Sequence, residues 1–240
     1  MTDATAMGRR RGTMPALALA ALALLAVALA AALLAADPAA RLERALGAMD
    51  RTEGLRFELV ALVEATGRGV APVGTDARMT GEYQSPDRLH VSIVSRGARR
   101  ELVIVGREQW VDDGGGYHTT VVVPEGPLRD ARAPLRFIRG GGSASFAGLG
   151  LSRGMPTYRV RLDLSAGDLA ERVFDGDSVP PDARGVIEVE IGLLDDLIRR
   201  QTVAITTGAD AFYSGHDEVR TTYTVEYWDH GQRQEVREPD

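Results

Sequence analysis

Hydrophobic and polar residues alternate with a period of two along most of the chain after residue 54. In residues 55–64, for example, Leu55, Phe57 and Leu59 alternate with charged residues. At least eight segments show this alternation, within residues 55–64, 79–83, 89–93, 117–123, 158–164, 187–191, 203–205 and 219–227, and residues 102–105 are apolar on both faces. One buried and one solvated face is typical of antiparallel strands, and a large twisted sheet does not stay flat. The pattern therefore predicts a curled antiparallel meander.

Three other segments favour helices. Residues 38–50 place apolar side chains three and four positions apart, which is the spacing of one helix face. A shorter helix is expected within residues 125–140, and another within 165–174, where Ser165 is a suitable N-cap. The 38–50 helix and the 125–140 segment are the candidates to cover the apolar face of the curled sheet. If they fill that face it is a core, and if they only line it, it is a pocket for an apolar ligand.

Residues 14–36 form an uncharged run of 23 residues, and three arginines at positions 9–11 precede it. A helix of this length rises about 1.5 Å per residue and is long enough to cross a bilayer core of about 30 Å. Because the positive charge comes first, we expect residues 1–13 in the cytoplasm and residues 37–240 outside it. The segment is expected to be an uncleaved signal anchor in the cytoplasmic membrane. A cleaved signal, leaving a secreted or periplasmic domain, and an ordinary buried helix are the alternatives.

Composition excludes several classes of chemistry. The chain has no cysteine, so disulfides, thiolate catalysis, zinc–cysteine sites and lipid-modified cysteine are all ruled out. It has no lysine, which removes a Schiff-base or P-loop lysine. The formal net charge is −6, whereas a nucleic-acid binder normally has a basic excess. We therefore expect no nucleic-acid partner.

Residue types that could catalyse a reaction or bind a metal are scattered along the sequence. The four histidines, His90, His118, His216 and His230, form no helical pair and match no zinc spacing. No serine lies in a Gly-x-Ser-x-Gly elbow, and no nucleophile–base pair is evident. The sequence therefore predicts no metal, no cofactor and no enzymatic activity.

Two regions carry a resemblance to a known family. They comprise residues 81–89 (GEYQSPDRL), 102–106 and 109–111 in the first half, and residues 185–191, 195–203 and 223–227 in the second. In these regions the chain resembles the LppX/LprAFG family of envelope lipoproteins and, more distantly, the LolA/LolB-like lipoprotein carriers. The resemblance implies an α+β, mainly antiparallel half-barrel, covered by helices on its concave side around a cavity for acyl chains. The lipidated cysteine of that family is absent here, and a permanent anchor would replace it.

We therefore expect a membrane-tethered protein that holds lipid or lipoprotein acyl chains in a hydrophobic cavity, for transport or presentation across the cell envelope. The residues expected to line the cavity are Phe57, Leu59, Tyr83, Val91, Ile93, Ile104, Trp110, Val160, Leu162, Val189 and Val225. Residues 139–154, which are rich in glycine, are expected to form a mobile loop at its mouth. The alternative is a non-enzymatic sensor or structural module with a packed core that binds an envelope protein partner.

Overall fold

The computed structural model describes residues 37–68, 71–120, 130–139, 143–173, 179–208 and 216–239. Within these residues, Pro38–Asp240 is one compact unit. The predicted cytoplasmic segment 1–13 and the predicted anchor 14–36 lie outside the described residues. None of the described helices combines the length and the apolar character that crossing a bilayer requires.

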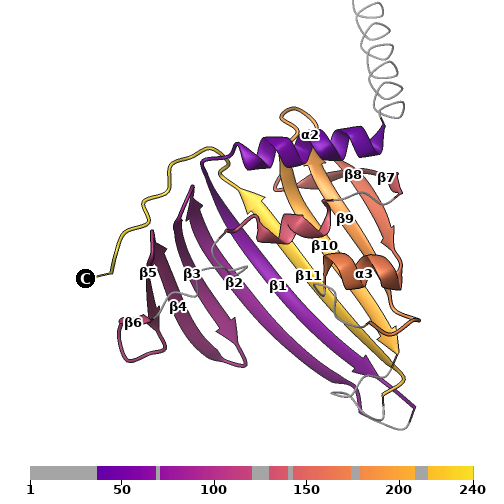
Figure 1. The fold of residues 1–240 in the computed structure, drawn as a ribbon, viewed down its shortest axis with the longest axis horizontal. Helices are drawn as coiled ribbons and strands as arrows, with labels where there is room; N and C mark the ends of the chain where they lie inside the picture. Colours follow the sequence, from indigo (N-terminus) through magenta and orange to yellow (C-terminus); the bar gives the residue numbers. More distant parts are fainter. Residues whose placement is uncertain are drawn as a thin grey trace, which may run out of the picture. The chain divides into compact units, whose positions relative to one another are not determined.

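Two α-helices, one 3₁₀ helix and eleven strands make up the described fold (Figure 1). The helices are α2 (Pro38–Asp50), η1 (Ala133–Phe137) and α3 (Ala166–Arg172). The strands are β1 (Gly54–Thr66), β2 (Val73–Gln84), β3 (Arg88–Ser95), β4 (Ala98–Val105), β5 (Glu108–Asp112), β6 (His118–Thr120), β7 (Ala144–Ser152), β8 (Met155–Leu164), β9 (Arg184–Gly192), β10 (Ile198–Gly208) and β11 (Glu218–Trp228).

The strands form one open sheet in the order β6-β5-β4-β3-β2-β1-β11-β10-β9-β8-β7, and every neighbouring pair is antiparallel. The predicted antiparallel sheet is confirmed. Its topology differs from a single meander, because the first and last strands pair at its centre. Arg56 of β1 lies opposite Trp228 of β11, so two meanders join along these two long strands.

Helix α2 has the bounds that its periodicity predicted. Leu42, Ala45, Leu46 and Met49 are buried along one side of it. Figure 1 shows α2 running across one end of the sheet, with α3 over the β9 region. The predicted cap of α3 is also confirmed, because the Ser165 hydroxyl accepts a hydrogen bond from the Asp168 backbone amide at 3.3 Å.

The core lies between these helices and the inner face of the sheet. Tyr158, Val160 and Ile191 have no solvent exposure, and Leu169 of α3 is equally buried. Gly185 permits this close packing, since a Cβ atom there would lie 2.8 Å from Leu169 Cδ2. The sheet under α2 and α3 is therefore filled by side chains.

The predicted loop at residues 139–154 is largely wrong. Residues 144–152 form β7, an edge strand paired with β8. A register shift between Phe146 and Gly148 interrupts the ladder, and Gly148 has a φ of 120°. The glycines of this segment lie in a bulged strand. Pairing with β8 offsets their low strand propensity.

Candidate functional site

A cavity of about 480 Å³ lies between the sheet and η1. Strands β1, β2, β10 and β11 supply its floor, and η1 and the end of α3 supply its cover. The lining residues are Leu59, Ala61, Met79, Ala133, Pro134, Arg136, Phe137, Val173, Gln201, Val203, Ile205, Thr207, Val219, Thr221, Tyr223 and Val225. The cavity is on the same face of the sheet as the filled core, since Val225 lies opposite Leu59 and Gln201, and Gln201 lies opposite Val189.

The space follows from the side chains at the centre of the sheet. Ala61 of β1 pairs with Ala77 of β2 on one side and with Tyr223 of β11 on the other. Two neighbouring alanines leave room above the sheet that larger residues would fill. Since Val203 and Ile205 continue the apolar surface along β10, the floor is mainly hydrocarbon.

Only a few polar groups border the cavity. Gln201 Nε2 donates a hydrogen bond to the Pro134 carbonyl at 2.9 Å, which connects the floor to the cover. Its Oε1 is buried and has no hydrogen-bond partner among the described residues. Burial raises the pKa of the Tyr223 phenol above its ordinary value of 10.0. A largely apolar cavity with a few polar groups is the usual character of a small-molecule site.

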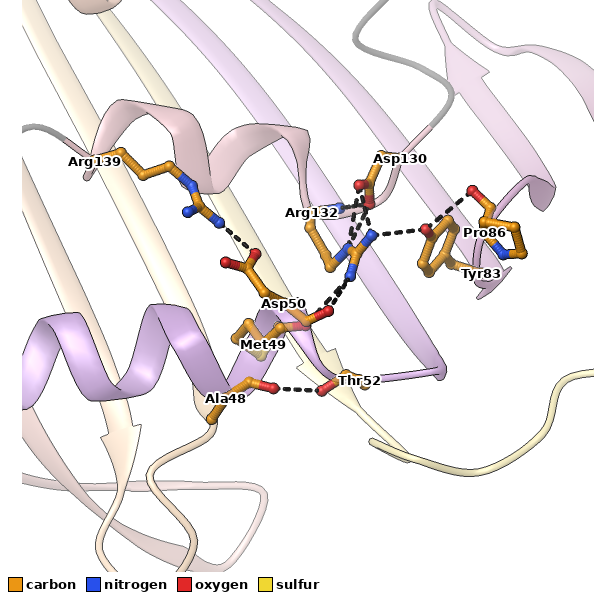
Figure 2. Close-up of polar contacts among 9 residues, drawn as sticks. All are labelled: Ala48, Met49, Asp50, Thr52, Tyr83, Pro86, Asp130, Arg132 and Arg139. Carbon is orange, nitrogen blue, oxygen red and sulfur yellow. Dashed lines mark hydrogen bonds and ion pairs between the residues drawn. The ribbon is translucent and has the colours of Figure 1, made fainter.

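Arg132 fixes the start of the cover to the rest of the fold (Figure 2). Its guanidinium donates to the Asp50 carbonyl at 2.9 Å, the Met49 carbonyl at 3.4 Å and the Tyr83 hydroxyl at 2.9 Å. It also donates to both carboxylate oxygens of Asp130. The last carbonyls of a helix lack intrahelical partners, so the end of α2 is a natural acceptor for a cation.

Electrostatics reinforce this contact. The hydrogen bonds to Asp130 raise the pKa of Arg132, against the opposing effect of burial. The guanidinium also lies 5.0 Å from the centre of the Tyr83 ring, within cation–π range. A second ion pair joins Arg139 to the Asp50 carboxylate (Figure 2). Segment 130–139 is thus held at both ends by arginines that reach the end of α2.

A smaller cavity of about 40 Å³ adjoins the large one. The two share Leu59, Met79, Pro134 and Val225, and the smaller one extends to Phe57, Leu89 and Val91. The apolar space therefore continues from the middle of the sheet toward β3.

The structure brings four of the predicted residues together at these cavities: Phe57, Leu59, Val91 and Val225. Five others are buried on the same face, away from the open space: Tyr83, Ile104, Val160, Leu162 and Val189. Tyr83 lies against Arg132, Ile104 is buried on β4 in the other half of the sheet, and the remaining three belong to the filled core.

Ile93 and Trp110 are placed differently. Ile93 pairs with Met79 on the inner face but is half-buried and lines neither cavity. Trp110 pairs with Val103, whereas Ile104 pairs with Gln109, so Trp110 is on the opposite face of the sheet. The sequence could not assign its face, because Trp110 and Val111 are both apolar and no alternation is visible there.

Sequence reasoning named segment 125–140 as a candidate cover, and η1 lies over the cavity as expected, but it did not name the individual lining residues of that segment. Ala133, Pro134, Arg136 and Phe137 fall in a segment that the strand rhythm does not reach, so no periodicity marked them. It also missed Val203 on the floor, where a signal existed: this residue continues the alternation of β10.

Side chains that could bind a metal ion do not gather in the part of the chain that the structure describes. No group of three or more His, Asp or Glu side chains is placed there to hold a metal ion. His90 faces Glu101 at 3.4 Å, and His230 contacts Arg199 and the Ile198 carbonyl. These histidines take part in structural contacts.

Two solved structures resemble this fold over most of the chain. The lipoprotein LppX of Mycobacterium tuberculosis matches 84% of this chain and 100% of its own, with 10% identity and a TM-score of 0.52. LprF of Mycobacterium bovis matches 84% of this chain and 96% of its own, with 12% identity and the same TM-score. This chain has the LppX/LprF fold. The predicted resemblance to the LppX/LprAFG family is thereby confirmed at the level of the fold.

The LppX/LprF fold is found here with little sequence similarity. No protein-family model matches the sequence, and no curated protein matches it. The structural matches also include a LolA superfamily protein from Nitrosomonas europaea, at 9% identity and a TM-score of 0.29.

Proposed function

We propose that this chain is a non-enzymatic lipid-binding protein of the cell envelope, which holds acyl chains in the cavity under η1. The observation that carries the proposal is the apolar space of about 480 Å³ between the central strands and their cover. Its volume is within the range of roughly 300–1,000 Å³ that is typical of small-molecule sites.

Hydrophobic burial alone is sufficient to hold such a ligand. Each methylene group that leaves water contributes about 0.8 kcal/mol. The floor offers Leu59, Val203, Ile205 and Val225 as apolar contacts, and Phe137 offers another from the cover. Arg136 also lines the cavity and is largely exposed, so a ligand's polar end would have a cation within reach.

The proposed location is extracytoplasmic, with residues 14–36 as the anchor in the cytoplasmic membrane. The uncharged run and the arginines before it support this arrangement. The likeness in fold to LppX, which is a lipoprotein, is consistent with it. If the segment is cleaved, the same domain would act as a secreted or periplasmic carrier.

The test uses the full chain in proteoliposomes that contain a fatty acid with a photoreactive group in its acyl chain. After illumination, mass spectrometry locates the labelled peptides. Labelling is expected on the inward positions of β10 and β11 and on segment 130–139. The Ala61→Trp variant should abolish it, because an indole at this central position occupies the space that the two alanines leave.

Ala204→Trp is the matched control. Ala204 neighbours Val203 along β10 but lies opposite Thr222, on the other face of the sheet. This variant should label like the unsubstituted chain. Absent labelling of the cavity peptides, or equal labelling in both variants, would contradict the proposal. That result would favour the alternative of a module that binds an envelope protein partner.

A further inference from the structure

Four large apolar side chains are exposed near one end of the sheet. Leu149 and Leu151 of β7 are 50% and 71% exposed, Met155 at the start of β8 is 40% exposed, and Leu194 between β9 and β10 is 83% exposed. We call these four residues, which lie on both faces of the β7–β8 hairpin and on the neighbouring turn, the leucine patch. Single exposed apolar residues are normal on a protein surface, whereas a cluster marks an interaction site.

Backbone contacts hold the parts of the leucine patch together. Leu151 pairs with Pro156 across the β7–β8 hairpin. The carbonyl of Pro156 in turn accepts a hydrogen bond from the Leu193 amide at 3.1 Å. The turn that carries Leu194 is therefore fixed beside the hairpin that carries the other three residues.

The first turn of α2 is attached to the same end of the sheet. Arg41, which is buried, donates to the carbonyls of Gly192 and Leu193, each at 3.4 Å. It also forms an ion pair of 3.1 Å with Asp196. Figure 1 shows the start of α2 close to β7 and β8 and the β9–β10 connection beside it.

The length of chain before α2 limits how far the patch can lie from residues 14–36. The uncharged run 14–36 ends two residues before Pro38, and Arg41 follows within one further turn of helix. At about 1.5 Å per helical residue, this separation is only on the order of 10 Å. A membrane that holds residues 14–36 therefore brings the start of α2, and the leucine patch with it, to its surface.

We infer that the leucine patch inserts into the surface of the bilayer from which the chain emerges. This inference rests on the anchoring that the proposed function includes. The contact is apolar in character, because the residues of the leucine patch carry no charge and the buried Arg41 is paired with Asp196. It therefore requires no anionic lipid, and it orients the β7 edge of the sheet toward the membrane.

The absence of cysteine in the chain allows a direct test. The Leu194→Cys variant of the full chain is labelled with the environment-sensitive fluorophore NBD and reconstituted in vesicles of phosphatidylcholine. The Val73→Cys variant is the matched control. Val73 is 42% exposed and pairs with Ala65, at the far end of β1 from α2.

The label at position 194 should emit at shorter wavelength than the label at position 73. It should be quenched by doxyl-labelled lipids and protected from aqueous iodide, and replacing a third of the lipid by phosphatidylglycerol should change little. Leu151→Cys serves as a second reporter in case position 194 disturbs its turn. Water-like emission at positions 151 and 194, equal to that at position 73, overturns the inference and leaves the patch to a partner protein.

The acyl photolabelling of the cavity, done in the same vesicles, separates this inference from the proposed function. If the cavity is labelled but the label at position 194 shows water-like emission, only the proposed membrane contact is ruled out. Loss of cavity labelling with a shielded label at position 194 removes the lipid-binding proposal and keeps the contact. If alkaline washing releases the chain from the vesicles, the proposed anchoring is wrong, and the inference fails with it.

Discussion

The inner face of the sheet has two regions that share one sequence pattern and differ in how they are filled. Under α2 and α3, the inward residues of β8 and β9, such as Val160 and Ile191, are completely buried. Under η1, the inward residues of β1 and β11, such as Leu59 and Tyr223, are half-buried and border a cavity. The alternation assigns a side chain to a face, and the segment that covers it decides whether that face becomes core or cavity.

The largest difference between the two regions should appear in stability. Leu162→Ala, in the filled region, should lower the free energy of unfolding by about 3 kcal/mol, because it opens a new cavity in close-packed surroundings. Leu59→Ala should cost only about 1 kcal/mol, since this side chain is half-buried and already borders open space. Urea unfolding of the full chain in detergent, followed by circular dichroism, measures both. Equal losses would mean that the two regions are equally filled.

Acid should weaken β10, the strand that connects the two regions. The His230 ring contacts the Ile198 carbonyl at 3.0 Å and Arg199 Nη1 at 2.9 Å. Burial, with a further contribution from the charge of Arg199, lowers the pKa of His230 to about 4 from its usual 6.5. The unfolded chain therefore binds a proton that the folded chain does not bind in this window, and stability falls as the pH drops from 6.5 toward 4.

This linkage should amount to about 2 kcal/mol between pH 7 and pH 4.5. Urea unfolding at both pH values measures it. His230→Gln serves as the control, because glutamine does not titrate and should lose less stability than the unsubstituted chain over the same interval. An identical pH dependence in the variant would show that the acid response arises from carboxylates elsewhere.

Removing the contacts that attach the cover should have the smallest effect on stability, and it should speed the release of a ligand from the cavity. Arg132→Met should cost about 1.5 kcal/mol, because the Tyr83 hydroxyl and the end of α2 lose their donor. Arg139→Met is the matched control, and it should cost less than about 0.5 kcal/mol, since both partners of its ion pair are about half exposed. Stopped-flow release of a fluorescent fatty acid should be faster in the first variant and nearly unchanged in the second. Equal release rates would mean that Arg132 does not hold the cover closed.

Periodic segments of this chain could be predicted from sequence, and segments placed by distant contacts could not. Helix α2 has its predicted bounds because its whole buried side follows one period. The sequence favours segment 125–140 as a cover, but its exact position depends on the bond from Arg132 to Tyr83, which lies 49 residues earlier. The glycines of residues 144–152 predict a loop, whereas the pairing with β8 makes this segment a strand.

The pairing of β1 with β11 has a consequence for how the chain matures. β1 is the first strand to leave the ribosome, yet one of its two neighbours, β11, is synthesised last. Arg56 therefore cannot pair with Trp228 until the last strand has been made. Loops of this length close slowly, because chain entropy is lost before the contacts that reward it form. Each meander can form by pairing consecutive strands as they emerge. The floor of the cavity contains strands of both meanders, so it forms only after the final strand has been translated.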